Sequence, residues 1–212
     1  MKKVILILAL LLGAAKVWGQ IPSEVTDVMD RCRAAMTNTA GLEYEMDLKA
    51  GLGPVAMKMH FVVADKGKLN RTTMNMKVLG AEITSESGFD GSDTWEIKHS
   101  SKGDTIIITR GDKRQKSDGN LAFDLDKKYR KAKMKLKEGY YDITFSEPID
   151  KDSEAKSIAV KISSKNYTMR ELRTSAHGAK ATMTVTRIRI GLKDSHFKLD
   201  LSKYPDAVVI RR

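Results

Sequence analysis

The sequence has few of the residues that carry covalent chemistry. Cys32 is the only cysteine among 212 residues, which excludes an intramolecular disulfide. It shares helical spacing with four apolar residues, Val25, Val28, Met29 and Met36. This spacing predicts a buried, structural thiol, because free cysteine is among the most buried residue types.

Motifs for metal binding and catalysis are also missing. The four histidines, His60, His99, His177 and His196, lie far apart, and none forms an HxxxH, HExxH or CxxC-type arrangement. A preformed metal site is therefore not expected. The sequence also contains no GxSxG elbow, GxxxxGK[ST] loop or GxGxxG turn. We expect neither an enzyme nor a bound cofactor, and an unrecognised hydrolase is the weakest alternative.

Aromatic residues are sparse: the chain has two Trp, six Tyr and five Phe. They are not interleaved with basic residues in a stacking pattern, which argues against nucleic-acid binding. The net charge of +11 nevertheless favours acidic partners or anionic surfaces.

The N-terminal 19 residues, MKKVILILALLLGAAKVWG, contain the one long apolar run, from Val4 to Ala15. Two lysines, a short apolar core and a terminal small residue are typical of a secretory signal peptide. The run is too short for a transmembrane helix, which needs about 20 residues, and no cysteine follows it, so the lipoprotein pattern is absent. We expect cleavage near residue 19, export to the periplasm, and one domain over residues 20–212.

Alternation of apolar and polar residues dominates the rest of the chain. In VAMKMHFVVA, residues 55–64, Met57, Met59 and Phe61 share one face, as in a half-buried strand. The same pattern predicts further strands at 42–50, 70–79, 81–89, 93–98, 104–110, 140–147, 155–163, 166–175 and 181–190, and a short strand in the C-terminal tail. In segment 181–190 the apolar parity switches between Val185 and Ile188, which indicates a bulge.

Two segments have helical spacing. The first runs from Ser23 to about Asn38. The second, residues 121–137, spaces Leu121, Leu125, Tyr129, Ala132 and Leu136 by three or four and has seven basic residues between positions 127 and 137. Its basic side is interpreted as a solvated outer face, or as a surface for anionic lipid or an acidic partner.

Methionines gather on the apolar faces of three successive predicted strands: Met46, Met57, Met59, Met74 and Met76. Ordinary core packing accounts for this pattern. A deformable surface for a flexible apolar ligand accounts for it equally well, because methionine adapts to changing partners.

These elements predict an α+β fold: a single curled antiparallel sheet that forms an unclosed β-barrel, with its apolar concave face covered by α-helices. A curled sheet with helices over its mouth encloses an apolar cavity.

The whole exported part of the chain resembles the periplasmic outer-membrane lipoprotein carrier family, the LolA/LolB-like lipoprotein-sorting proteins. The resemblance rests on the N-terminal helix, the Met-rich strands, FDGSDTWEI, YYDITFSE, AKSIAVKIS, NYTMRELRTS and LKDSHFKLDLSKYPDAVVI. Its most specific positions are Asp90, Gly91 and Trp95, and then Phe197, Pro205, Val208, Val209 and Ile210.

The resemblance implies a monomeric half-barrel that binds the acyl chains of lipoproteins, or another lipid, for delivery toward the outer membrane. Its partners would be an inner-membrane release complex and an outer-membrane acceptor. The family also has an arginine that couples its lid to ligand entry, and Arg71 lies nearest that position, although by parity it falls opposite Met74 and Met76. The implied cavity residues are Met46, Leu48, Met57, Met59, Phe61, Met74, Met76, Trp95 and Ile97.

One alternative has the same architecture: a sensor or interaction module that binds a lipid or a protein partner without shuttling cargo. A carrier must release its cargo to an acceptor, whereas a sensor need only bind and change its affinity for a partner.

Overall fold

The computed structural model describes residues 21–37, 40–52, 55–78, 81–101, 103–113, 124–150, 155–176 and 179–212. The expected signal peptide lies outside these residues. The helices are α2 (Ser23–Met36) and α3 (Leu125–Lys128), with 3₁₀ turns η1 (Asp194–Phe197) and η2 (Leu201–Lys203). The strands are β1 (Leu42–Leu52), β2 (Val55–Lys66), β3 (Leu69–Val78), β4 (Ala81–Phe89), β5 (Asp93–Lys98), β6 (Thr105–Arg110), β7 (Tyr129–Lys137), β8 (Tyr140–Pro148), β9 (Ser157–Ser163), β10 (Met169–Ala176), β11 (Ala179–Ile190) and β12 (Val208–Arg211).

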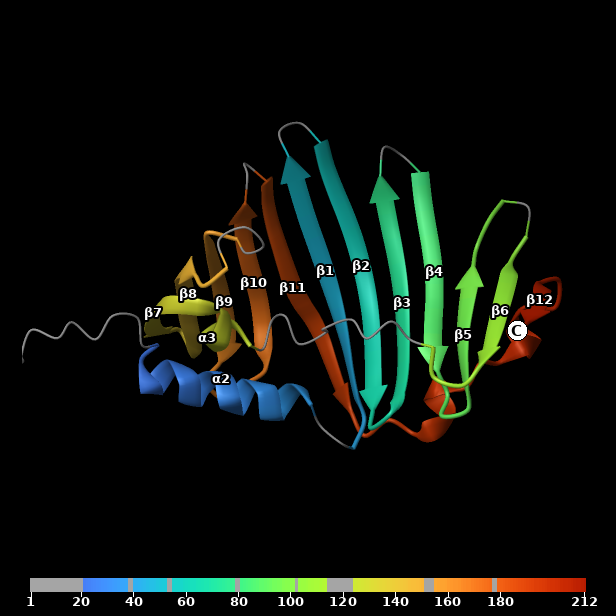
Figure 1. The fold of residues 1–212 in the computed structure, drawn as a ribbon, viewed down its shortest axis with the longest axis horizontal. Coiled ribbons are helices and arrows are strands. Elements are labelled where there is room, and N and C mark those ends of the chain that lie inside the picture. The colour runs from blue at the N-terminus through green and yellow to red at the C-terminus, as the bar shows by residue number, and fades with distance from the viewer. Residues whose placement is uncertain are drawn as a thin grey trace, which may run out of the picture.

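All twelve described strands belong to one sheet, in the order β12-β6-β5-β4-β3-β2-β1-β11-β10-β9-β8-β7. Every neighbouring pair is antiparallel except β12 and β6, which are parallel. Figure 1 shows this sheet as a broad, open layer with β7 and β12 at opposite ends. The fold is therefore mostly β. The expected single, largely antiparallel sheet is confirmed, but the expected barrel shape is wrong because the sheet is not strongly curled.

The main core lies between α2 and one end of the sheet. The predicted apolar stripe of α2 is buried, and Met29 and Cys32 are 0% and 1% exposed. This stripe packs on side chains of β8, β9 and β11, including Ile143, Phe145 and Val160. The prediction that Cys32 is a buried thiol is confirmed.

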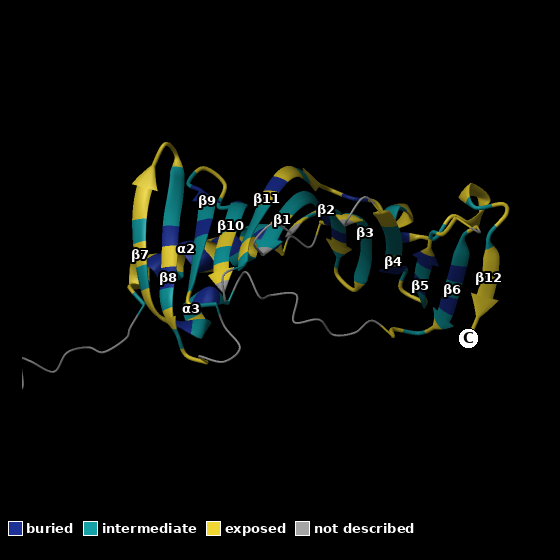
Figure 2. Cartoon of the chain, turned by 90° about the horizontal axis from the view of Figure 1, so that it is seen from above, coloured by how far each residue is buried: buried dark blue, intermediate teal, exposed yellow. Residues whose placement is uncertain are grey.

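A second, smaller core lies on the opposite face of the sheet, near its other end. Trp95, Ile97, Ile106 and Ile108 of β5 and β6 are buried there. Residues of the C-terminal segment, Leu199, Tyr204 and Ala207, pack over them. Figure 2 shows the result: buried positions concentrate toward the two ends of the sheet, whereas β2 and β3 between them are mostly half-buried.

The predicted helix at residues 121–137 is wrong. Residues 121–123 lie outside the described residues; within 124–137 only Leu125–Lys128 is helical, and Tyr129–Lys137 forms strand β7, which pairs with β8. Residues 131–137 also alternate, with Ala132, Met134 and Leu136 on one face and lysines on the other. This period of two decides the conformation because β8 offers an apolar neighbour to each of those side chains, such as Phe145 opposite Ala132.

The bulge predicted in segment 181–190 is confirmed. The register between β1 and β11 shifts after Glu45, which lies opposite Arg187, whereas the next residue, Met46, lies opposite Val185. The shift keeps both Val185 and Ile188 on the face that α2 covers.

Candidate functional site

The methionines of the first three strands lie side by side on one face of the sheet. In register, Leu48 of β1 is opposite Met59 of β2, which is opposite Met76 of β3. One step along the strands, Met46, Phe61 and Met74 form a second such row. We refer to one set of side chains on this face as the methionine face: Met46, Leu48, Met57, Met59, Phe61, Met74 and Met76.

The methionine face continues the main core across the sheet. The row of Leu48 extends through Met183 and Leu172 to Val160 and Ile143 under α2. In the other direction it ends at Ile83 of β4, which is 46% exposed. One apolar strip thus crosses the sheet, and α2 covers only part of it.

The side chains of the methionine face are half-buried. Among the described elements, both α-helices belong to the β7 to β11 end of the sheet, and neither lies over β2 and β3 (Figure 1). The 3₁₀ turn η1 contacts β3 on the side of Arg71, away from the methionine face. Flexible thioethers on an open sheet can repack around a guest of variable shape. The arrangement suits an apolar ligand, whose binding would bury surface that is now partly in water.

Two expected cavity residues lie elsewhere. Trp95 and Ile97 share a face with Gly88 and Glu86 of β4, and Gly88 is opposite Arg71 of β3. Paired residues of adjacent strands point to the same side of a sheet, and Arg71 alternates with Met74 and Met76 along β3. Trp95 and Ile97 therefore point away from the methionine face. They are packed beneath the C-terminal segment, so the structure brings together seven of the nine expected residues and separates these two.

Arg71 also lies on that opposite face, as its parity predicted. Its guanidinium donates to Glu86 Oε2 at 2.8 Å and to the carbonyl of His196 at 3.4 Å. It also lies 5.8 Å from the centre of the Trp95 ring. Arg71 therefore links β3 and β4 to the C-terminal segment, and none of its contacts within the described ranges supports the expected coupling to a helical lid.

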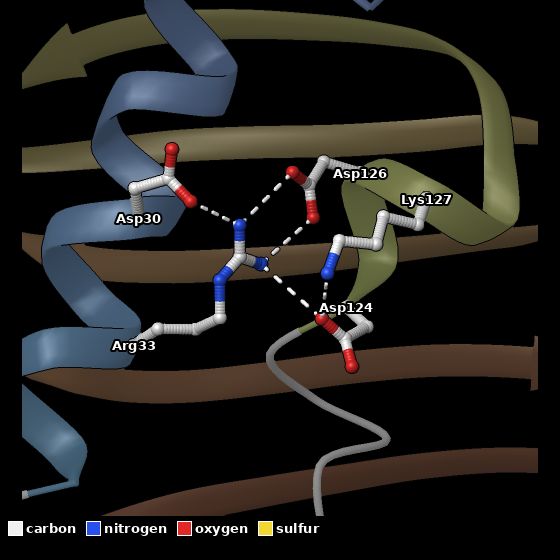
Figure 3. A network of polar contacts seen from close by, with 5 residues as sticks. All are labelled: Asp30, Arg33, Asp124, Asp126 and Lys127. Atoms are coloured by element: carbon white, nitrogen blue, oxygen red, sulfur yellow. Dashed lines mark hydrogen bonds and ion pairs between the residues drawn. The ribbon is translucent and has the colours of Figure 1, made fainter.

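A different arginine joins the two helices. Arg33 of α2 donates to Asp126 of α3 through both terminal nitrogens, at 2.9 and 3.2 Å (Figure 3). It also pairs with Asp30 on its own helix and lies 3.5 Å from Asp124, which accepts from Lys127. Sequence reasoning missed this network, because the pattern gave no reason to pair two predicted helices through these positions.

Hydrogen bonding and burial raise the pKa of three groups on α2 and β1. The hydrogen bond to Asp126 is the main cause that raises the pKa of Arg33 above its usual range. Desolvation raises the pKa of Tyr44, next to Met46 in the sheet face, to about 12, and that of Cys32 to about 12. All three groups therefore keep their neutral-pH protonation state, and none is poised as an acid or base near neutral pH.

Within the described ranges, no group of three or more His, Cys, Asp and Glu side chains is placed to hold a metal ion. None of the helices in that part of the chain has the length and apolar character to cross a bilayer.

Sequence comparison finds no matching family model and no significantly similar curated protein. Among solved structures, an uncharacterized conserved protein from Thermus thermophilus aligns with a TM-score of 0.52 and 11% identity, over 89% of this chain and 99% of that one. The chain therefore shares its fold with that protein.

Two further alignments have lower TM-scores. LprF from Mycobacterium bovis aligns with a TM-score of 0.45 and 10% identity, over 79% of this chain and 94% of that one. LolA superfamily protein NE2245 from Nitrosomonas europaea aligns with a TM-score of 0.38 and 9% identity, over 82% and 97%. We draw no functional conclusion from either alignment.

Proposed function

We propose that the chain is an exported carrier that binds the acyl chains of lipoproteins on the methionine face. The observation that carries this proposal is the apolar strip that runs from under α2 to Ile83 while only its first part is covered. An acyl chain laid along the strip would be stabilised by about 0.8 kcal/mol for each methylene group that it buries. The sequence resemblance to the lipoprotein carriers points to the same ligand.

The open shape of the sheet also favours a second candidate. An uncurled face offers an apolar protein segment the same surface as an acyl chain, as a sensor or interaction module would require. The two candidates differ in release: a carrier passes its lipid to an acceptor, and a sensor does not.

The first test is native mass spectrometry of the protein purified from the cell envelope of its source organism, which should show a co-purified lipid or lipopeptide. In parallel, titration with a fluorescent fatty-acyl probe compares the wild type with Met59→Gln. We expect the variant to bind the probe about tenfold more weakly, which corresponds to about 1.4 kcal/mol, because it places an amide in the apolar strip.

Lys58→Gln is the matched control, because Lys58 precedes Met59 on β2 and its side chain points to the other face. Equal affinity of wild type and Met59→Gln, or no probe binding by the wild type, would contradict the proposal. Transfer of bound probe from the protein to acceptor vesicles separates a carrier from a sensor.

A further inference from the structure

Three lysines stand directly opposite one another on the face of the sheet that is turned away from the methionines. Lys49 of β1 is opposite Lys58 of β2, which is opposite Lys77 of β3. Directly opposed side chains on antiparallel strands have Cβ atoms about 4.5–5.5 Å apart, and like charges there are destabilising. We call this row the lysine ladder.

The three ammonium groups are not neutralised by the fold. All three lysines are exposed, and no ion pair joins them to a carboxylate of the described residues. Two carboxylates lie nearby. Asp47 binds His60 Nδ1 at 2.8 Å, and Glu82 is opposite Lys77 but forms no ion pair with Lys77. With Lys180, the four lysines outnumber these two carboxylates, so the local charge stays positive.

A shallow hollow of about 250 Å³ lies along the ladder. Its polar lining comes from the ladder, from Glu82 opposite Lys77, and from the neighbouring row of Asp47, His60 and Asn75. Lys180 of β11, exposed and opposite Gly51 of β1, adds a further positive charge one row away. This part of the sheet thus offers space and positive charge for anionic groups.

The ladder lies at one end of the molecule. Lys77 and Lys180 are each one residue from a strand end, at Val78 and Ala179, and Lys49 and Lys58 are each three residues from the facing ends of β1 and β2. In Figure 1 this end of β1 to β4 points upward, away from α2 and from the C-terminal segment. The methionine face reaches the same end on the reverse side through Met57, which is opposite Ala50.

We propose that the lysine ladder docks the protein on the anionic phospholipid headgroups of a bilayer. The inference rests on the proposed function, because an acyl-binding protein meets its ligand at a membrane. Phosphate groups complement closely spaced ammonium groups and relieve their mutual repulsion, and the long lysine stems can reach headgroups beside the sheet. Docking by this end places the methionine face next to the source of acyl chains.

The test is co-sedimentation of the exported protein, residues 20–212, with phosphatidylcholine vesicles, with and without phosphatidylglycerol. The ladder variant carries Lys49→Gln, Lys58→Gln and Lys77→Gln. The matched control carries Lys133→Gln, Lys135→Gln and Lys137→Gln, which remove the same charge from β7 on the same face of the sheet. We expect the wild type to bind only vesicles with phosphatidylglycerol, the ladder variant to bind them at least about tenfold more weakly, and the control to change less than about twofold.

Equal losses in both variants would overturn the proposal, because attraction would then follow net charge alone. Unchanged binding of the ladder variant, or complete competition by millimolar inorganic phosphate at constant ionic strength, would also overturn it. The ladder variant should melt at or above the wild-type temperature, because repulsion is removed, so a loss of vesicle binding is not a folding defect.

The acyl-probe titration keeps the two proposals apart. A ladder variant that loses vesicle binding and keeps wild-type probe affinity supports docking by the ladder. A wild type that binds the probe and ignores phosphatidylglycerol overturns the docking and leaves the proposed function standing. Ladder-dependent vesicle binding without probe binding supports the docking and contradicts the proposed function.

Discussion

Arg33 and Asp126, 93 positions apart in the chain, form a two-pronged ion pair that ties α2 to α3. The Asp126 side chain is only 4% exposed and that of Arg33 is 20% exposed. Since α2 covers the main core and α3 leads directly into β7, this pair holds the helical layer to the end of the sheet (Figure 3).

We predict that Asp126→Asn lowers the free energy of unfolding by about 1–3 kcal/mol, because it removes the charge that pairs with Arg33 in a mostly buried place. Asp30→Asn is the control: Asp30 also contacts Arg33, but its side chain is 61% exposed, so the change should stay within about 0.5 kcal/mol. Urea unfolding at neutral pH measures both. Equal effects would show that Arg33 gains no more from α3 than from its own helix.

Met29 and Met59 should respond differently to truncation. Met29 is fully buried under α2, so Met29→Ala should cost about 2–5 kcal/mol of stability. Met59 is half-buried on the open strip, so Met59→Ala has fewer contacts to lose and should cost less than half as much. Chemical unfolding of the two variants tests this. A larger loss at Met59 would mean that the methionine face is ordinary packed core.

Gly88 should not tolerate a side chain. A Cβ atom there would lie 2.6 Å from the carbonyl oxygen of Asn70 and 2.6 Å from Cζ2 of Trp95. We predict that Gly88→Ala costs about 1–3 kcal/mol and shifts the fluorescence of Trp95, because the backbone or the ring must move. Ser87→Ala, at the exposed neighbouring position, should leave both unchanged. An unaltered spectrum and stability in Gly88→Ala would show that the ring packs elsewhere.

The Cys32 thiol should be inert in the folded protein. Burial raises its pKa from 9.0 to about 12, so at pH 8 the native state has about a thousandfold less thiolate than the unfolded chain. Because the folded pKa is the higher one, its contribution to stability is complete below pH 9 and declines between about 9 and 12. A thiol reagent should label the protein rapidly in urea and at least about a hundredfold more slowly without it. Rapid labelling of the native protein would contradict the buried position.

Local patterns determined much of this fold. Alternation over two residues is a property of each strand alone, so it located β2, β5 and β8, and it also revealed the bulge between Val185 and Ile188. The buried apolar stripe of α2 was equally predictable from the sequence, because burial of Met29 and Cys32 follows from their helical spacing. The grouping of the methionines on one face followed from the parity of successive hairpins.

Segment 121–137 shows the limit of such patterns. Its apolar residues fit a helical period, yet Lys131, Lys133 and Lys135 also alternate with Ala132 and Met134. Two periods competed within one stretch, and pairing with the edge of β8, with which β7 exchanges backbone hydrogen bonds, decided in favour of the strand.

The sequence by itself determined which side chains within a strand share a face, including Met57, Met59 and Phe61 and, separately, Trp95 and Ile97. Only the tertiary structure decided that these two sets lie on opposite sides of the sheet, because that relation depends on the register of β2, β3, β4 and β5 together. The same holds for the open sheet, since closure depends on how twist accumulates over twelve strands and on the pairing of β12 with β6. Arg33 and Asp126 meet for the same reason: their contact is a consequence of where α2 and α3 pack, and no local period encodes it.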